Sequence, residues 1–286
     1  MKKILVTGAT GFIGPYVIEA LLHAGCKVIA SSSNAGKAAA QPWFKDVKYV
    51  SFNFEDFDDG IDYYEFFGRP DKMIHLAWEG LPNYKEAFHV EVNLPRHQLL
   101  LGNLLRNGLS DLTVTGTCLE YGLQEGCLKE DNAVFPSNPY AVAKNSLRVW
   151  LEKEQITKNF HLKWVRLFYM YGDGQNPNSI LSQLDRALQN GDTSFNMSGG
   201  EQLRDYLPVT LVGDHIARIA LQQGVESIIN CCSGVPISIS QLVEDHLAQK
   251  KAIIQLNKGF YPYTNYEPMA FWGDPAKLKQ IINSPS

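Results

Sequence analysis

Short apolar runs recur along the chain, and most are followed by a segment in which apolar residues return every three or four positions. The runs are typical of parallel strands buried on both faces, and the intervening spacing is typical of amphipathic helices. The expected strands lie at residues 4–7, 27–31, 48–52, 72–76, 112–115, 162–168 and 227–231. The expected helices lie at residues 12–24, 83–106, 139–158, 179–190 and 240–251. This alternation predicts an α/β fold with a doubly wound parallel sheet.

Three evenly spaced glycines join the first expected strand to the first expected helix. Gly8 permits a tight turn, Gly11 lets the backbone approach a pyrophosphate, and Gly14 allows the helix to pack closely on the sheet. The free N–H groups of the first helical turn face that anion. The segment, which includes Phe12 and Ile13, therefore favours a dinucleotide site over a plain strand-to-helix turn.

The end of the second strand offers no acidic side chain to bind the two hydroxyls of an adenosine ribose. Ser32 and Ser33 stand there instead, with Lys37 nearby, and small hydroxyls beside an ammonium can admit a 2′-phosphate. We therefore expect NADPH as the cofactor, with NADH as the second choice. A polar turn that contacts neither is the alternative interpretation.

The regular alternation loosens after residue 168, where turn-rich stretches become common. We expect a Rossmann-like dinucleotide-binding domain at residues 1–168 and a smaller C-terminal lobe at residues 169–286 that mainly binds substrate. The two are interleaved, because the apolar run at residues 227–231 is expected to return to the sheet.

Composition narrows the classes of partner. A net charge of −4, a pI near 6.0 and the absence of a basic run argue against nucleic acid. The first apolar run is short and no run approaches about 18 residues, so we expect neither a signal peptide nor a membrane span, and a cytoplasmic location. The five cysteines lack the paired spacing of a zinc site or a disulfide framework, so we expect reduced thiols and no metal.

Tyr140 and Lys144 are four positions apart, directly after a helix N-terminal signal. Asn138 is suited to cap the helix and Pro139 to take its first position. The pair then shares one helical face with Leu147, which is expected in the core. Buried polar groups need partners or a function, which favours a reactive pair over an exposed one. The spacing alone is a weak signal, because chance produces it about once in a chain of this composition.

Thr117 follows the strand expected at residues 112–115. It therefore stands at the carboxyl end of the sheet, where ligands of open α/β folds bind. A hydroxyl there can bind a substrate carbonyl oxygen, while a tyrosine supplies a proton and a lysine ammonium stabilises the phenolate. The alternative for Thr117 is a hydroxyl satisfied by nearby backbone.

These motifs, with the Arg-Asp-Tyr sequence that begins at Arg204, stand in an order and at separations that resemble the extended short-chain dehydrogenase/reductase family, of the NAD-dependent epimerase/dehydratase type. This family contains the nucleotide-sugar epimerases, dehydratases and reductases, and the resemblance covers nearly the whole chain. It implies that Thr117 orients the substrate oxygen and that Tyr140 is the acid/base. It also implies that Lys144 holds the nicotinamide ribose and lowers the tyrosine pKa, and that Arg204 binds the substrate diphosphate.

The same resemblance implies roles for further residues. Leu76 and Ala77 match the loop beneath the nicotinamide. Asn53 and Phe54 match the pair that contacts adenine, with Asn where the family more often has Asp. The substrate-side candidates are Trp78, Glu79, Asn93 and Tyr169, the last standing where epimerases commonly have Asn.

One departure from the family pattern narrows the reaction. Family members that act as 4,6-dehydratases follow the residue that matches Thr117 with Asp and Glu, which eliminate water, whereas Cys118 and Leu119 follow it here. Glu120 comes one position too late, and on a strand it would turn to the opposite face. Dehydration is therefore not expected.

The expected reaction is the NAD(P)H-dependent reduction of a nucleotide-linked 4-keto-6-deoxyhexose, such as dTDP-4-dehydro-6-deoxyglucose, to the 4-hydroxy deoxysugar. Such reactions make deoxysugars for surface polysaccharides. A nucleotide-sugar 4-epimerase that uses NAD is the alternative, because it needs the same tyrosine and lysine. A non-catalytic dinucleotide sensor is disfavoured, since a sensor needs no proton donor. The helices expected at residues 83–106 and 139–158 match the family's dimer interface, which implies a homodimer.

Overall fold

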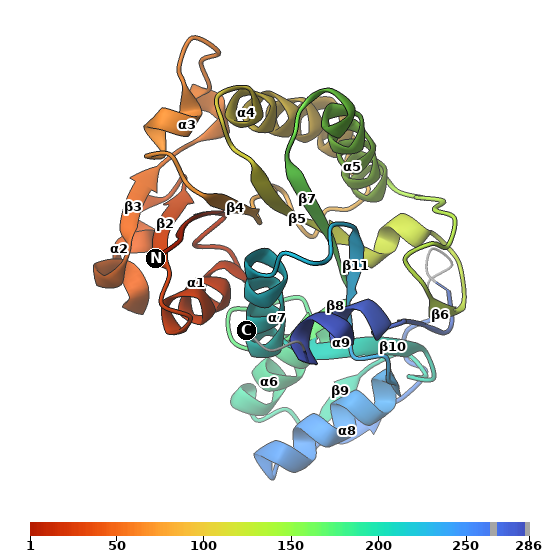
Figure 1. Cartoon of the computed structure of the whole chain (residues 1–286). Helices are drawn as coiled ribbons and strands as arrows, with labels where there is room; N and C mark the ends of the chain where they lie inside the picture. The colour runs from red at the N-terminus through yellow and green to blue at the C-terminus, as the bar shows by residue number, and fades with distance from the viewer. Residues whose placement is uncertain (264–267, 284–286) are drawn as a thin grey trace.

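The computed structural model describes residues 1–263 and 268–283. Its central sheet has seven strands, all parallel, in the order β11-β7-β5-β4-β1-β2-β3 (Figure 1). These strands are β1 (Lys3–Thr7), β2 (Lys27–Ser32), β3 (Lys48–Ser51), β4 (Lys72–His75), β5 (Asp111–Thr117), β7 (His161–Leu167) and β11 (Ile228–Cys231). The predicted Rossmann-like, doubly wound parallel sheet is confirmed.

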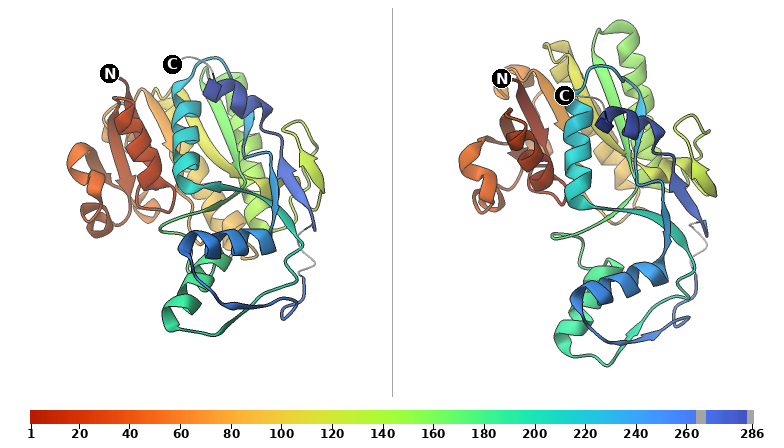
Figure 2. Two further views of the ribbon diagram at one scale, coloured as in Figure 1. Left: turned by 90° about the horizontal axis from the view of Figure 1, so that it is seen from below. Right: turned by 60° about the horizontal axis from the view of Figure 1, so that its bottom comes forward.

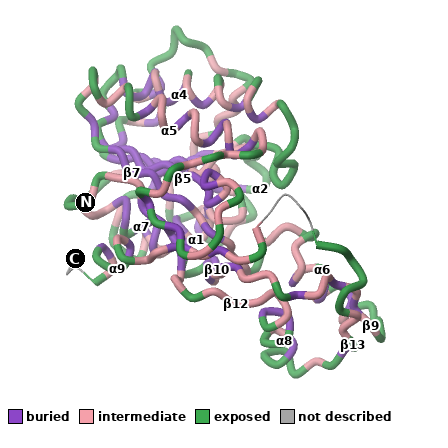
Figure 3. Tube along the Cα trace, turned by 90° about the vertical axis from the view of Figure 1, so that its right-hand side faces the viewer, coloured by how far each residue is buried: buried purple, intermediate pink, exposed green. Residues whose placement is uncertain are grey.

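Helices cover both faces of this sheet, and the buried residues concentrate along its strands (Figure 3). One face carries α1 (Gly14–His23), α7 (Val209–Leu221) and α9 (Ala276–Asn283), and the other carries α4 (Leu94–Arg106) and α5 (Pro139–Thr157). Successive residues of β1 serve the two layers in turn: Ile4 and Val6 pack in the first apolar cluster and Leu5 in the second. All three are fully buried, as a strand covered on both faces requires.

The second lobe consists of small sheets packed on two helices (Figure 2). Its strands and helices are β8 (Tyr169–Tyr171), α6 (Ile180–Asn190), β9 (Ser194–Asn196), β10 (Leu203–Pro208), β12 (Pro236–Ser238), α8 (Ile239–Lys250) and β13 (Gln255–Asn257). β14 (Phe271–Gly273) pairs with β6 (Gly126–Leu128). β11 and α7 come from the same part of the chain but belong to the central sheet and its helical layer. The remaining short helices are α2 (Ala35–Ala39), α3 (Tyr63–Phe66), the 3-10 helices Pro42–Asp46, Phe54–Asp56 and Cys118–Tyr121, and the π-helix His89–Asn93.

Element ends follow local caps, and several differ from the expected ones. α5 begins as predicted, because Asn138 accepts a hydrogen bond from the Ala141 N–H at 2.9 Å. α1 begins at Gly14 rather than at residue 12. The helix expected at residues 83–106 is wrong before residue 89, since the π-helix His89–Asn93 leads directly into α4. Pro95 has no N–H to bond the carbonyl four residues earlier, so the α-helical ladder cannot extend back through it. Among the described residues, no helix is both long and apolar enough to cross a membrane.

Candidate active site

The glycine turn lies at the carboxyl end of β1, against the chain that leaves β4. Gly8 has φ +71°, and a Cβ placed on it would come within 2.7 Å of the Ala77 nitrogen. A Cβ on Gly14 would come within 2.5 Å of the carbonyl oxygens of Gly8 and Ala9. Only glycine fits at both positions, so the turn is kept bare of side chains beside the N-terminus of α1. This cradle fits the pyrophosphate of a dinucleotide.

At the end of β2, some polar side chains are hydrogen-bonded within the protein and others are exposed. The Ser32 hydroxyl is 3.1 Å from the Tyr49 hydroxyl, which also donates to the Ser32 carbonyl at 2.8 Å. Asn34 caps α2 by accepting a hydrogen bond from the Lys37 N–H at 2.8 Å. Ser33 and Lys37 have exposed side chains. Of the residues predicted to meet the adenosine ribose, these two are therefore the more accessible.

The predicted adenine pair follows β3. The Asn53 side chain accepts a hydrogen bond from the Glu55 N–H at 3.2 Å and so caps a 3-10 helix. The Phe54 ring lies 4.5 Å, centroid to centroid, from the imidazole of His97, a buried residue of α4. The contact of both residues with adenine stays a prediction.

Thr117, Tyr140 and Lys144 come together where β5 ends and α5 begins. The Lys144 Nζ donates to the carbonyl of Thr115 in β5 at 2.9 Å. The phenol of Tyr140 lies close enough to the side chain of Thr117 for that side chain to lower the pKa of the phenol. All three predicted catalytic residues are buried. A hydroxyl, a phenol and an ammonium thus share one small region at the carboxyl end of the sheet, where ligands of open α/β sheets bind.

Burial sets the protonation of this group. Loss of hydration lowers the pKa of Lys144 to about 7, although the Glu120 carboxylate acts in the opposite direction. Burial also raises the pKa of Tyr140, with further contributions from Tyr84, Glu120 and Cys118, while the side chain of Thr117 lowers it. The Lys144 Nζ is 6.0 Å from the centre of the Tyr140 ring. The phenol is therefore held in its protonated form, the form that can donate a proton.

Glu120 was expected on a strand, and this expectation is wrong. It lies in the 3-10 helix Cys118–Tyr121, and its fully buried carboxylate accepts a hydrogen bond from the Thr117 N–H at 2.9 Å. It also accepts from Trp164 Nε1 at 3.0 Å and from Arg166 Nε at 2.9 Å. The sequence signal was a capping box, because Thr117 caps the helix and Glu120 stands three residues later. With its carboxylate engaged in this way, Glu120 does not replace the missing dehydratase acid.

The substrate-side candidates make specific contacts with one another and with their neighbours. Asn93 is buried and donates to the Glu79 carbonyl at 3.0 Å, so it fastens the chain that follows β4. The Glu79 carboxylate is 3.6 Å from a guanidinium nitrogen of Arg96. Trp78 Nε1 donates to His89 Nδ1 at 3.0 Å. His89 was not among the predicted residues; its ring also lies 5.4 Å from that of Tyr140.

Arg204 and Tyr169 lie together in the second lobe. The Arg204 guanidinium is buried, donates to the Leu203 carbonyl at 2.9 Å and lies 4.7 Å from the centre of the Phe271 ring. It is 5.8 Å from the ring of Tyr169, which packs against Tyr206. Arg204 and Tyr206 share one face of β10, because side chains alternate along a strand.

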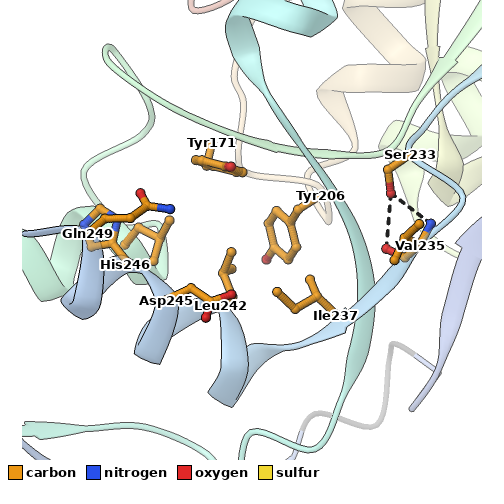
Figure 4. Close-up of a pocket in the computed structure, with 10 residues that line it drawn as sticks. Tyr171, Tyr206, Ser233, Val235, Ile237, Leu242, Asp245, His246 and Gln249 are labelled. Atoms are coloured by element: carbon orange, nitrogen blue, oxygen red, sulfur yellow. Dashed lines mark hydrogen bonds between the residues drawn. The ribbon is translucent and has the colours of Figure 1, made fainter.

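Tyr206 also lines a cavity of about 270 Å³ between β8, β10, β12 and α8 (Figure 4). Tyr171 lies across from Tyr206, and α8 contributes Asp245 and Gln249 (Figure 4). The lining of this cavity does not include Thr117, Tyr140 or Lys144. The hollow therefore belongs to the second lobe rather than to the three clustered residues.

Known proteins resemble this chain over almost its whole length. The model of the "NAD dependent epimerase/dehydratase family" matches residues 4–232, which is more than half of the chain. The dTDP-6-deoxy-L-talose 4-dehydrogenase (NAD(+)) of Aggregatibacter actinomycetemcomitans is 29% identical, over 95% of this chain and 99% of its own. The GDP-6-deoxy-D-talose 4-dehydrogenase of the same organism is 24% identical, over 99% of this chain and 92% of its own.

Solved structures share the fold. The UDP-glucuronic acid 4-epimerase from Bacillus cereus, in complex with UDP-glucuronic acid and NAD, superposes with a TM-score of 0.84 at 21% identity. The match covers 99% of this chain and 94% of that one. At this level of identity the likeness shows the fold alone.

The buried lysine gives stability a testable dependence on pH. The unfolded chain keeps Lys144 protonated up to about pH 10.5, whereas the folded protein releases that proton near pH 7. Between these values the folded state binds fewer protons, so stability rises with pH, by at most about 1.4 kcal/mol per pH unit from this group. Urea unfolding at pH 7 and pH 9 should show this rise in the wild type, and a smaller rise in Lys144→Met. The exposed Lys27→Met is the matched control; equal slopes in all three proteins would contradict the assignment.

Proposed function

Because the chain belongs to the NAD-dependent epimerase/dehydratase family, we propose that it reduces the 4-keto group of a nucleotide-linked 4-keto-6-deoxyhexose to a hydroxyl. The observation that carries this proposal is the grouping of Thr117, Tyr140 and Lys144 at the carboxyl end of β5. The bare glycine turn, whose Gly8 adjoins Ala77, provides a place for the dinucleotide beside them.

In the proposed reaction the chain handles a proton and a developing negative charge. The nicotinamide, when bound, supplies the hydride that C4 receives. The hydroxyl of Thr117 orients the keto oxygen, and the phenol of Tyr140 gives that oxygen its proton. The ammonium of Lys144 favours the phenolate that remains. The raised pKa of Tyr140 keeps its phenol protonated, which is the form that can give this proton.

The names of two relatives support the choice of sugar. Both are 4-dehydrogenases of a 6-deoxytalose, one linked to dTDP and the other to GDP. We infer that this chain also acts at C4 of a 6-deoxyhexose and that Arg204 binds the diphosphate, since it stands beside Tyr169 in the substrate lobe. Turnover of the same sugar linked to dTDP, GDP or UDP tests which nucleotide is preferred.

A 4-epimerase is the second candidate, because it needs the same tyrosine and lysine. Against it stands Tyr169 at the position where epimerases commonly have Asn. Dehydration is disfavoured, because Cys118 and Leu119 follow Thr117 and the Glu120 carboxylate is engaged with Arg166.

A panel of 4-keto-6-deoxyhexoses linked to dTDP, GDP and UDP tests the reaction. We expect a stoichiometric loss of absorbance at 340 nm from the reduced cofactor, and NMR of the product should show a new 4-hydroxyl. The purified protein should carry little cofactor, since a reductase releases the dinucleotide after each turnover. Bound NAD after purification, with interconversion of 4-hydroxy sugars and no cofactor consumption, would establish the epimerase instead.

Replacing the proton donor separates chemistry from binding. Tyr140→Phe should lower kcat by at least about 100-fold, because general acid catalysis contributes on this scale, and should leave the Kd of the dinucleotide within about threefold. Tyr64→Phe, which removes a phenol from α3, is the control and should retain wild-type turnover. Unchanged turnover in Tyr140→Phe would remove this tyrosine from the mechanism.

The cofactor proposal is NADPH, supported by the absence of an acidic residue at the end of β2 and by the exposed Ser33 and Lys37. The first relative is named for NAD(+), so the two donors must be compared directly. We expect a higher kcat/KM with NADPH, and a carboxylate introduced by Ser33→Asp should lower that preference by about tenfold or more through repulsion of the 2′-phosphate. Asn34→Asp, one position later but in the cap of α2, tests for a general charge effect. A clear NADH preference of the wild type would refute the proposal.

A further inference from the structure

The half-buried indole of Trp78 lies among buried side chains that include both members of the predicted Tyr-Lys pair. The Lys144 Nζ stands over the indole at 4.2 Å from the ring centre. The imidazole of His97 stacks on the same indole, with centroids 4.5 Å apart and planes 7° from parallel. The Tyr140 ring makes a T-shaped contact with the indole, with ring centroids 6.0 Å apart and an interplanar angle of 72°. Trp78 thus packs against both members of the predicted Tyr-Lys pair.

His89 holds the edge of the indole. It accepts the Trp78 Nε1 hydrogen bond on Nδ1 at 3.0 Å, and its Nε2 is 3.1 Å from the Asn83 carbonyl. An indole N–H only donates and a carbonyl only accepts, so the proton of this imidazole is on Nε2. Burial lowers the pKa of His89, which keeps the ring neutral as both bonds require.

Two further histidines lie behind the stacked face of the indole: His97 stacks on it, and His75 is hydrogen-bonded to His97. His97 Nδ1 is 2.7 Å from His75 Nε2, and His75 Nδ1 is 2.8 Å from the hydroxyl of Thr7, the residue before Gly8. Burial lowers the pKa of His75 to about 3 and that of His97 well below its usual range, so both rings are uncharged. A continuous set of contacts therefore joins the glycine turn, through Trp78, to Lys144.

The indole face matters because Lys144 has lost its water. A buried ammonium depends on the groups that face it, here the Thr115 carbonyl and the π surface of Trp78, and burial still lowers the pKa of Lys144 to about 7. A desolvated cation–π contact is worth about 1–2 kcal/mol, a factor of roughly 5 to 30 in an equilibrium or a rate.

We propose that Trp78 is a positioning residue that holds the Lys144 ammonium beside Tyr140, and that His89 fixes the orientation of its indole. The proposal deepens the function proposed above, because it takes Lys144 to act in the same reaction. It assigns to Trp78 a role toward the protein's own lysine in place of the substrate contact first expected for it. His89 becomes the residue on which that role depends.

Turnover of paired variants tests the proposal. Trp78→Leu and His89→Leu should each lower kcat by about 5- to 30-fold with the KM for the sugar within twofold, and His89→Gln, which can keep one acceptor and one donor, should recover most of the loss. Trp43→Leu removes a buried tryptophan of the other apolar cluster and should retain kcat. A raised KM with unchanged kcat in Trp78→Leu would overturn the proposal in favour of a substrate contact.

An NMR signal keeps this test separate from the activity. The Lys144 ε-methylene protons should be shifted upfield by the indole ring current, can be assigned by their loss in Lys144→Met, and should return toward ordinary lysine values in Trp78→Leu. Circular dichroism confirms folding of each variant, and His89→Gln supplies a conservative change if a leucine variant unfolds. An unshifted signal in the wild type overturns the proposal whatever the substrate is. A shifted signal together with no turnover of any ketosugar would leave this contact standing and refute the proposed reaction.

Discussion

The fully buried carboxylate of Glu120 is the charge around which this site is built. Its oxygens accept hydrogen bonds from the Thr117 N–H in β5 and from Trp164 and Arg166 in β7. A charge removed from water must be paired and hydrogen-bonded, and removing one partner of such a pair costs about 3–5 kcal/mol. The ends of β5 and β7 and the 3-10 helix between them therefore have one favourable arrangement, and Thr117 is presented in that arrangement.

The same cost of desolvation also determines which groups surround the charge on Lys144, a member of the proposed catalytic group. Arg166 is paired with Glu120, and the groups nearest the Lys144 ammonium are a carbonyl and an aromatic ring, while the Glu120 carboxylate raises the lysine pKa from farther away. These partners carry no net charge, so they stabilise a cation without neutralising it. In the reaction proposed above, the field of the ammonium would be available to negative charge that develops on the substrate oxygen, which is where preorganised electrostatics lower a barrier.

The parts of the site that could be predicted are those in which short-range pattern determines geometry. Gly8 and Gly14 are readable because a turn between strand and helix leaves few choices, and Tyr140 and Lys144 because Asn138 fixes the start of their helix. Glu120 was misplaced although Thr117 and Glu120 spell a capping box, because strand alternation was applied to residues that follow the end of β5. His89 was missed for a different reason: its partner Trp78 is eleven positions away through an irregular segment, and only the folded chain brings the two rings together.

The interleaving of the two lobes has a consequence for synthesis of the chain. β11 forms an edge of the central sheet, and α7 and α9 cover one face of it, yet all three lie beyond residue 208. A nascent chain that has emerged only through β7 therefore exposes the apolar side of its sheet near Val165 to water or to chaperones. The glycine turn is made first, but the helical layer that completes the central sheet is supplied last, so a chain truncated midway would be an aggregation-prone fragment.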